Sequence, residues 1–164
     1  VPLLSQLNEA VLLRLIEKCR MINYDVGEVV IQEKNNADSL FILLQGTVTI
    51  FVERKANVFM DAEETIVISE VQAPATVGEI GFLLDTARTA SVRAKTSVQS
   101  LQLSKNAFFT LFEHTKGFGI GIAQGLANRV NALTQKIVDD AIEQSRARLK
   151  GEVTEAEESQ DILF

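Results

Sequence analysis

TVGEIGFLLDTARTASVRA, residues Thr76–Ala94, is the stretch around which the rest of the chain is organised. It opens with Gly78-Glu79, passes through a short apolar run and closes on Arg88 at the start of a strand-like alternation. Gly78 permits a positive φ or a close backbone approach, and the apolar run can form one helical turn whose free N–H groups attract an anion. Arg88 offers a planar fork of donors for a phosphate, and Glu79 offers an acceptor for sugar hydroxyls. We therefore predict a phosphorylated sugar as the ligand.

The spacing of the Gly-Glu step and the arginine, taken together, is a more specific signal than either feature alone. Taken singly, a Gly-Glu step is an ordinary turn, and an arginine after a loop is usually solvated. Here Arg88-Thr89-Ala90 begins nine residues after Glu79 and leads into apolar alternation, a pattern that resembles the phosphate-binding cassette of the cyclic nucleotide-binding domain family. The order Gly27-Glu28, 38–43 (DSLFIL) and 46–48 (GTV) resembles an earlier block of the same family. The resemblance covers roughly residues 3–138.

One loop departs from the family pattern. The family usually has glycines before the Asp38-Ser39 pair, whereas this chain has Lys34-Asn35-Asn36-Ala37. Asparagine tolerates the left-handed conformation better than most residues. We expect Asn35 or Asn36 to supply it.

Composition limits the class of protein. The 164 residues, 46% of them hydrophobic, suffice for one domain with a core and an appendage, and the net charge of −6 argues against direct nucleic-acid binding. Cys19 is the single cysteine, which favours a reducing cytoplasm, and Cys19 with His114 cannot complete a zinc site, so we predict no metal and no cofactor. No apolar run reaches the length of a membrane span, and no signal peptide opens the chain. The start at Val1 suggests a piece of a longer protein.

The periodicity predicts a mainly β fold with flanking helices. Residues 5–20 read as a helix with Ser5 as N-cap and Cys19 on its apolar stripe. Short strands are predicted at 29–31, 39–44, 47–52, 65–71, 91–94 and 98–103. A charged, irregular loop is expected over 53–64, where Val58, Phe59 and Met60 cover the core or touch a partner. The period also changes toward two from residue 22, so the chain is expected to form seven or eight close strands in all. This number predicts an antiparallel β-barrel or jelly roll, and the resemblance implies the cupin-like double-stranded β-helix.

The C-terminal part reads as helical. Ser104 is predicted to cap a helix through Phe112, and the glycines of 117–125 to form a hinge. A long helix from about 119 to about 149 carries an apolar stripe that we expect to pair with a second copy as a parallel coiled coil, although the stripe can also pack within one chain. Beyond Gly151 the acidic tail is predicted to be disordered or to lead to a further domain, and 162–164 (ILF) to be a docking motif. The predicted domains are 1–115, 116–150 and 151–164.

The resemblance also implies roles for individual residues. Glu79 would accept the ribose 2′-hydroxyl and Arg88 would pair with the cyclic phosphate, while Thr89 would reach the phosphate or the base. Thr134 would cap the base from the long helix. The ligand-binding residues predicted in this way are Gly78, Glu79, Ile80, Gly81, Arg88, Thr89, Ala90 and Thr134. cAMP is the first choice of ligand and cGMP the second, because a threonine at Thr89 occurs with both bases in the family.

Together these features predict a regulatory domain without a catalytic site. As the resemblance implies, it senses a cyclic nucleotide, dimerises through the long helix and transmits binding to an effector domain or partner protein. Two alternatives remain open: a dimerisation scaffold that binds no nucleotide, and a transcription regulator cut before its DNA-binding domain. No helix-turn-helix follows the long helix in this sequence.

Overall fold

The computed structural model describes the backbone of residues 1–57 and 60–161. It divides into two compact units, Val1–Gly125 and Leu126–Phe164. The first unit contains every strand of the described residues and the start of the long helix, and the second contains the remainder of that helix. The domain bounds 1–115, 116–150 and 151–164 stay a prediction.

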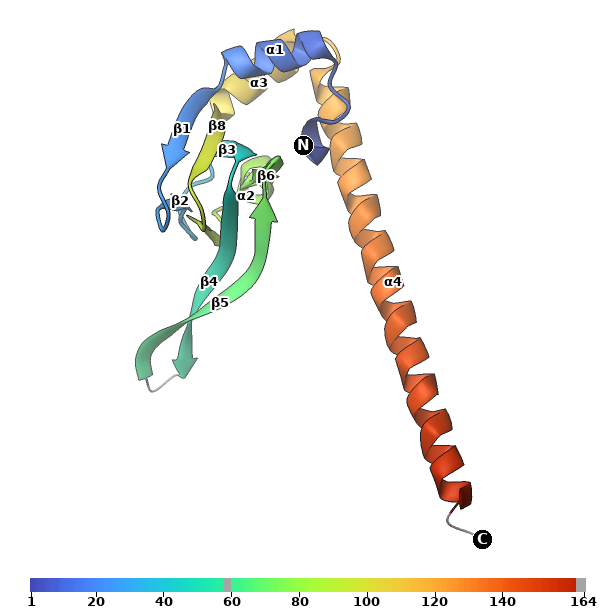
Figure 1. Ribbon diagram of the computed structural model, residues 1–164. Coiled ribbons are helices and arrows are strands. Elements are labelled where there is room, and N and C mark those ends of the chain that lie inside the picture. Colours follow the sequence, from blue (N-terminus) through green and yellow to red (C-terminus); the bar gives the residue numbers. More distant parts are fainter. Residues whose placement is uncertain (58–59, 162–164) are drawn as a thin grey trace. The chain divides into compact units, whose positions relative to one another are not determined.

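Eight strands form two antiparallel four-stranded sheets (Figure 1). One sheet has the order β1-β8-β3-β6 and the other β2-β7-β4-β5. The strand bounds are β1 Arg20–Tyr24, β2 Val29–Ile31, β3 Ser39–Gln45, β4 Thr47–Asn57, β5 Met60–Gln72, β6 Ala75–Val77, β7 Ser91–Ala94 and β8 Val98–Ser104. The predicted mainly β fold is confirmed in its two-sheet, jelly-roll form; among the described residues the sheets do not close into a barrel.

The core lies between the two sheets and is built from alternating apolar positions. Val48, Val92 and Ala94 come from one sheet, and Leu43 and Val98 come from the other, each almost completely buried. Burying a valine or leucine side chain contributes about 1.5–3 kcal/mol, so this cluster stabilises the fold substantially. The core thereby gives a rigid support to the loop that leads into β7.

The first helix is shorter than the sequence predicts. α1 spans Glu9–Glu17, and its N-cap is Asn8, whose side chain accepts a 3.0 Å hydrogen bond from the Val11 amide. Ser5 is therefore not the cap, because a short 3₁₀ helix at Pro2–Leu4 (η1) and a following turn occupy the preceding residues. Cys19 lies beyond the helix and is half-buried. Burial raises the pKa of its thiol to about 11, which agrees with a packing role.

The predicted irregular loop at 53–64 is wrong over most of its length. β4 and β5 continue as a two-stranded hairpin in which Lys55 pairs with Glu63 and Asn57 with Met60. The sequence of this ribbon is charged and has no apolar alternation that would predict strands. Val58 and Phe59 lie outside the described residues, and Met60 belongs to β5.

The C-terminal helices begin as predicted but end differently. α3 spans Lys105–His114, and the Ser104 hydroxyl accepts a hydrogen bond from the Ala107 amide, which confirms the predicted cap. α4 spans Phe118–Asp161, so the helix continues past 149, and the disorder expected after Gly151 is wrong over 151–161. The proposed docking motif at 162–164 lies outside the described residues.

The glycines near the start of α4 have different structural roles. Gly117 has a φ of 88° and connects α3 to α4. Gly121 and Gly125 lie inside α4, where a Cβ would collide with the Leu7 side chain and the Leu3 carbonyl respectively. These two glycines therefore allow close packing within the first unit, and the hinge prediction remains with Gly117.

In the second unit, α4 exposes a row of apolar side chains. They are Val130, Leu133, Ile137, Val138 and Ile142. No helix in the described part of the chain is long and apolar enough to cross a membrane.

Candidate functional site

The cassette connects β6 to β7 through the short helix α2, Glu79–Leu84. Gly78 precedes α2 with φ 81° and ψ 8°, so the predicted positive φ is confirmed. A Cβ at this position would lie 2.7 Å from Arg88 Nη1 and 2.7 Å from the Ile31 Cδ1 atom. Glycine is therefore required here both for its backbone conformation and for the close approach of Arg88.

Arg88 is the buried cation of the cassette, with 7% of its surface exposed. Its Nη1 donates to the Gly78 carbonyl at 2.8 Å, and its Nη2 donates to the Ser39 carbonyl at 2.5 Å. Burial lowers the pKa of Arg88, and the negative charge of Asp38 opposes that shift. A guanidinium stays protonated under all ordinary conditions and has five N–H donors, so Arg88 brings a desolvated positive charge to the cassette.

Glu79 is the second buried charged residue, with 6% of its surface exposed. It is the first residue of α2 and follows Gly78 directly, so the glycine turn determines where its carboxylate lies. Gly81 is also buried, and a Cβ on it would come 3.0 Å from the Ala87 carbonyl. These positions match the sequence prediction that a glycine, a carboxylate and an arginine share one compact loop.

The remaining predicted site residues are less enclosed. Ile80 is 52% exposed, Thr89 is exposed and Ala90 is half-buried. Thr134 belongs to the second unit, where its hydroxyl donates to the Val130 carbonyl at 3.0 Å within α4. The role of Thr134 as a cap on the base therefore stays a prediction.

The preceding loop holds the cassette by backbone hydrogen bonds that the sequence did not reveal. The Lys34 amide donates to the Arg88 carbonyl, and the Arg88 amide donates to the Asn35 carbonyl, both at 2.9 Å. The left-handed residue of this loop is Lys34, with φ 68°, so the expectation for Asn35 or Asn36 is wrong. Lysine does not favour the left-handed conformation. The two backbone hydrogen bonds between this loop and Arg88 offset the free energy that this conformation costs.

Two further contacts join α3 to the cassette. The Phe82 and Phe108 rings meet edge to face with centroids 5.2 Å apart. Lys105 forms an ion pair with Asp85, the left-handed C-cap residue of α2. The helix α3 therefore contacts the apolar run of the cassette at Phe82.

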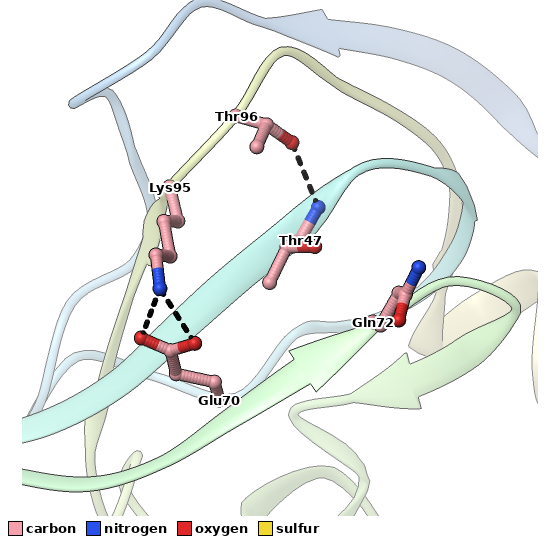
Figure 2. A pocket seen from close by; sticks show the side chains of 5 residues that line it. All are labelled: Thr47, Glu70, Gln72, Lys95 and Thr96. Carbon is pink, nitrogen blue, oxygen red and sulfur yellow. Dashed lines mark hydrogen bonds and ion pairs between the residues drawn. The ribbon is translucent and has the colours of Figure 1, made fainter.

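A second polar cluster lies at the other end of β7 (Figure 2). It lines a pocket of about 320 Å³ with side chains of Thr47, Glu70, Gln72, Lys95 and Thr96. Lys95 Nζ lies 2.6 and 2.7 Å from the two carboxylate oxygens of Glu70, and the Thr96 hydroxyl accepts from the Thr47 amide at 2.9 Å. The charges in this pocket neutralise each other. Within the described part of the chain, no three His, Cys, Asp or Glu side chains are grouped so that they could hold a metal ion.

The cyclic nucleotide-binding domain family matches residues 21–115, more than half of the chain and the whole of the cassette. The chain therefore belongs to this family. The match covers a binding domain.

Similar proteins agree with this assignment. A cAMP-dependent protein kinase regulatory subunit from Emericella nidulans is 32% identical over 108 residues, which is 66% of this chain and 24% of the relative. Human cGMP-dependent protein kinase 2 is 27% identical over 93 residues, covering 57% of this chain and 11% of the kinase. This chain thus spans about a quarter or less of the length of these relatives.

Among solved structures, the Thermus thermophilus catabolite activator protein matches with a TM-score of 0.68 at 17% identity. The match covers 84% of this chain and 62% of that chain. At this level of identity the similarity establishes the fold.

Proposed function

We propose that this chain is a regulatory domain that binds a cyclic nucleotide, with cAMP the first choice and cGMP the second, in the cassette of residues 78–90. The observation that carries the proposal is the buried guanidinium of Arg88, whose described hydrogen bonds go to neutral carbonyl oxygens. A cyclic phosphate has one negative charge and two exocyclic oxygens that match the fork of a guanidinium. Its binding would place a negative charge directly on this buried guanidinium, in addition to the nearby negative charge of Asp38.

Each cassette residue has a role in this proposal. Arg88 pairs with the exocyclic oxygens, and Glu79 accepts the ribose 2′-hydroxyl as the family resemblance implies. The backbone N–H groups of Gly78, Ile80 and Gly81 donate to the phosphate, with Thr89 and Ala90 beside it. Thr134 is proposed as a cap on the base. The relatives include the regulatory subunit of a cAMP-dependent protein kinase and a cGMP-dependent protein kinase, so their names support either base.

The output of the domain is proposed to pass through its helices. The Phe82–Phe108 contact and the Lys105–Asp85 pair link the cassette to α3, so a ligand that shifts the cassette also acts on this helix. The exposed apolar row on α4 is proposed to pair with the same row of a second copy. The effector lies in another part of a longer protein or in a partner, and we propose no catalysis by this domain. Its predicted cytoplasmic location stays a prediction.

A second candidate is a scaffold that binds no nucleotide. It is favoured by the two hydrogen bonds through which Arg88 already joins the Gly78 and Ser39 carbonyls, because these bonds give the arginine a structural use. The two candidates differ in whether a cyclic phosphate adds stability to the folded chain.

Isothermal titration calorimetry and thermal unfolding with cAMP, cGMP and linear 5′-AMP separate these candidates. We expect cAMP or cGMP to bind, and a ligand at one hundred times its dissociation constant to add about 2.7 kcal/mol of stability. 5′-AMP is the matched control because it has the same base and sugar with an open phosphate. If neither cyclic nucleotide binds or stabilises the chain, the scaffold is the better explanation.

A further inference from the structure

The hairpin of β4 and β5 extends beyond the sheet that contains it (Figure 1). β7 pairs with β4 over Val48–Phe51, whereas the pairing of β4 with β5 continues to Asn57. The outer part of the hairpin is therefore two-stranded in the described structure. Arg54 lies in this outer part and reaches back to the loop that precedes β3.

The contact that Arg54 makes is a partly buried ion pair. Its Nη1 lies 2.8 Å from Glu33 Oε1 and 3.0 Å from Glu33 Oε2. The Arg54 side chain is 48% exposed, but that of Glu33 is only 10% exposed. A carboxylate with so little access to water depends more on its cation than a surface carboxylate does.

Glu33 belongs to the loop that holds the backbone of the cassette. The Glu33 amide donates to the Ser91 hydroxyl at 2.9 Å, and the Gln32 side chain donates to the same oxygen at 3.3 Å. The next two residues, Lys34 and Asn35, form the two backbone hydrogen bonds with Arg88. Four consecutive loop residues are thus hydrogen-bonded to Arg88 or to Ser91.

The conformation of this loop depends on contacts from outside it. Lys34 is left-handed at φ 68°, a conformation that a lysine does not prefer by itself. The ion pair of Glu33 with Arg54 holds the residue immediately before Lys34. Releasing Glu33 therefore loosens the part of the loop that fixes the Arg88 backbone.

We propose that Arg54 is a positioning residue through which the β4–β5 hairpin sets the affinity of the cassette for its ligand. The connection runs from Arg54 through Glu33 to the loop and then to the backbone of Arg88. The affinity part of this inference rests on the proposed function, while the positioning part concerns the unliganded chain as well. Any partner that moves the outer hairpin would change the site by this connection.

The structure contains a matched control for this inference. Lys95, which directly follows β7, forms an ion pair with Glu70 of β5, and the exposure of its side chain, 51%, is similar to that of Arg54. That pair lies at the other end of β7, away from the cassette. Removing it changes the charge by the same amount without touching the loop that holds Arg88.

The test compares Arg54→Gln, Glu33→Gln, the double variant and Lys95→Gln by calorimetry with cAMP and cGMP. We expect each of the first two to weaken binding about three- to tenfold, and the double variant to be no weaker than the weaker single variant. Arg54→Lys should stay within about twofold of the wild type, because a single Nη1 makes both contacts with Glu33. Equal losses in Arg54→Gln and Lys95→Gln, or no loss in Arg54→Gln, would overturn the proposal.

Amide hydrogen exchange in the unliganded protein gives a second readout. Exchange at the Lys34 and Arg88 amides should be faster in Arg54→Gln than in the wild type, and unchanged in Lys95→Gln. If the wild type binds neither nucleotide, the proposed function fails, and this exchange measurement still decides whether Arg54 positions the loop. Unchanged exchange at both amides in Arg54→Gln would refute the positioning role.

Discussion

The two ends of strand β7 hold two cations in opposite situations. Before the strand, Arg88 is 7% exposed and donates to the carbonyls of Gly78 and Ser39. After the strand, Lys95 is half-exposed and faces both oxygens of the Glu70 carboxylate (Figure 2). An exposed ion pair contributes about 0–1 kcal/mol, whereas a buried cation whose hydrogen bonds go to neutral carbonyls gains more from an anion that binds to it. The comparison therefore separates a buried guanidinium, on which the proposed phosphate site rests, from an exposed ammonium that is already neutralised.

The largest expected effect on ligand affinity comes from reversing the charge of Arg88, and removing the charge of Lys95 is its comparison. Arg88→Glu should weaken cyclic nucleotide binding by at least about thirtyfold, because losing the partner of a buried charge costs about 2–5 kcal/mol. Lys95→Gln should leave the affinity within about twofold. Calorimetry measures both, and circular dichroism checks that Arg88→Glu is folded. Arg88→Lys keeps the charge without the fork and should lie between the wild type and Arg88→Glu if the pairing is bidentate. Equal affinity in all four proteins would remove the distinction between the two ends.

A smaller effect is expected from substituting Gly78, whose Cβ position lies next to the Arg88 guanidinium. Gly78→Ala introduces a Cβ 2.7 Å from Arg88 Nη1 in a backbone with φ 81°, so it combines a clash with an unfavourable conformation. Gly27→Ala is the matched control, because Gly27 has φ 89° but no atom within 4 Å of its Cβ position.

We expect Gly27→Ala to lower the free energy of unfolding by about 1–2 kcal/mol through the conformation alone. Gly78→Ala should lower it by about 1–3 kcal/mol more and should also weaken ligand binding. Chemical denaturation and titration measure these two quantities. Similar losses in both variants would mean that Arg88 moves aside without cost, and that its buried position is not tightly held.

The smallest effect concerns the loop that fixes the Arg88 backbone. Lys34→Gly should raise the free energy of unfolding by about 0.5 kcal/mol, because glycine accepts φ 68° without strain and this gain exceeds its greater unfolded-state entropy. Asn35→Gly, at the next position with an ordinary φ, should lower the free energy of unfolding by a similar amount. Opposite signs in urea denaturation would confirm that Lys34 is strained; a loss in Lys34→Gly would contradict it.

Features that depend on a few neighbouring residues could be read from the sequence. The left-handed Gly78, the short helix that begins at Glu79 and the Ser104 cap each arise from local backbone chemistry. Six of the eight described strands were also predictable, since alternating apolar side chains must face a common interior, whereas β1 and β6 were not among the predicted ranges.

Features that depend on distant contacts could not be read in the same way. Asn8 rather than Ser5 caps α1 because the preceding residues fold into a 3₁₀ helix and a turn. Lys34 rather than an asparagine is left-handed because Arg88 accepts and donates hydrogen bonds on either side of it. The outer hairpin has no apolar alternation, so nothing local distinguishes its strands from a charged loop.

The cassette illustrates both levels. Its chemical content, a glycine turn followed by a carboxylate and a guanidinium, is a property of the sequence, because these groups lie within about a dozen residues and need only a short backbone turn to meet. The burial of Arg88, its hydrogen bond to Ser39 at a separation of 49 residues and the tie from Arg54 through Glu33 arise only in the folded chain. Those properties depend on which strands pair and in what register, and strand pairing joins residues whose separation along the chain carries no local signal.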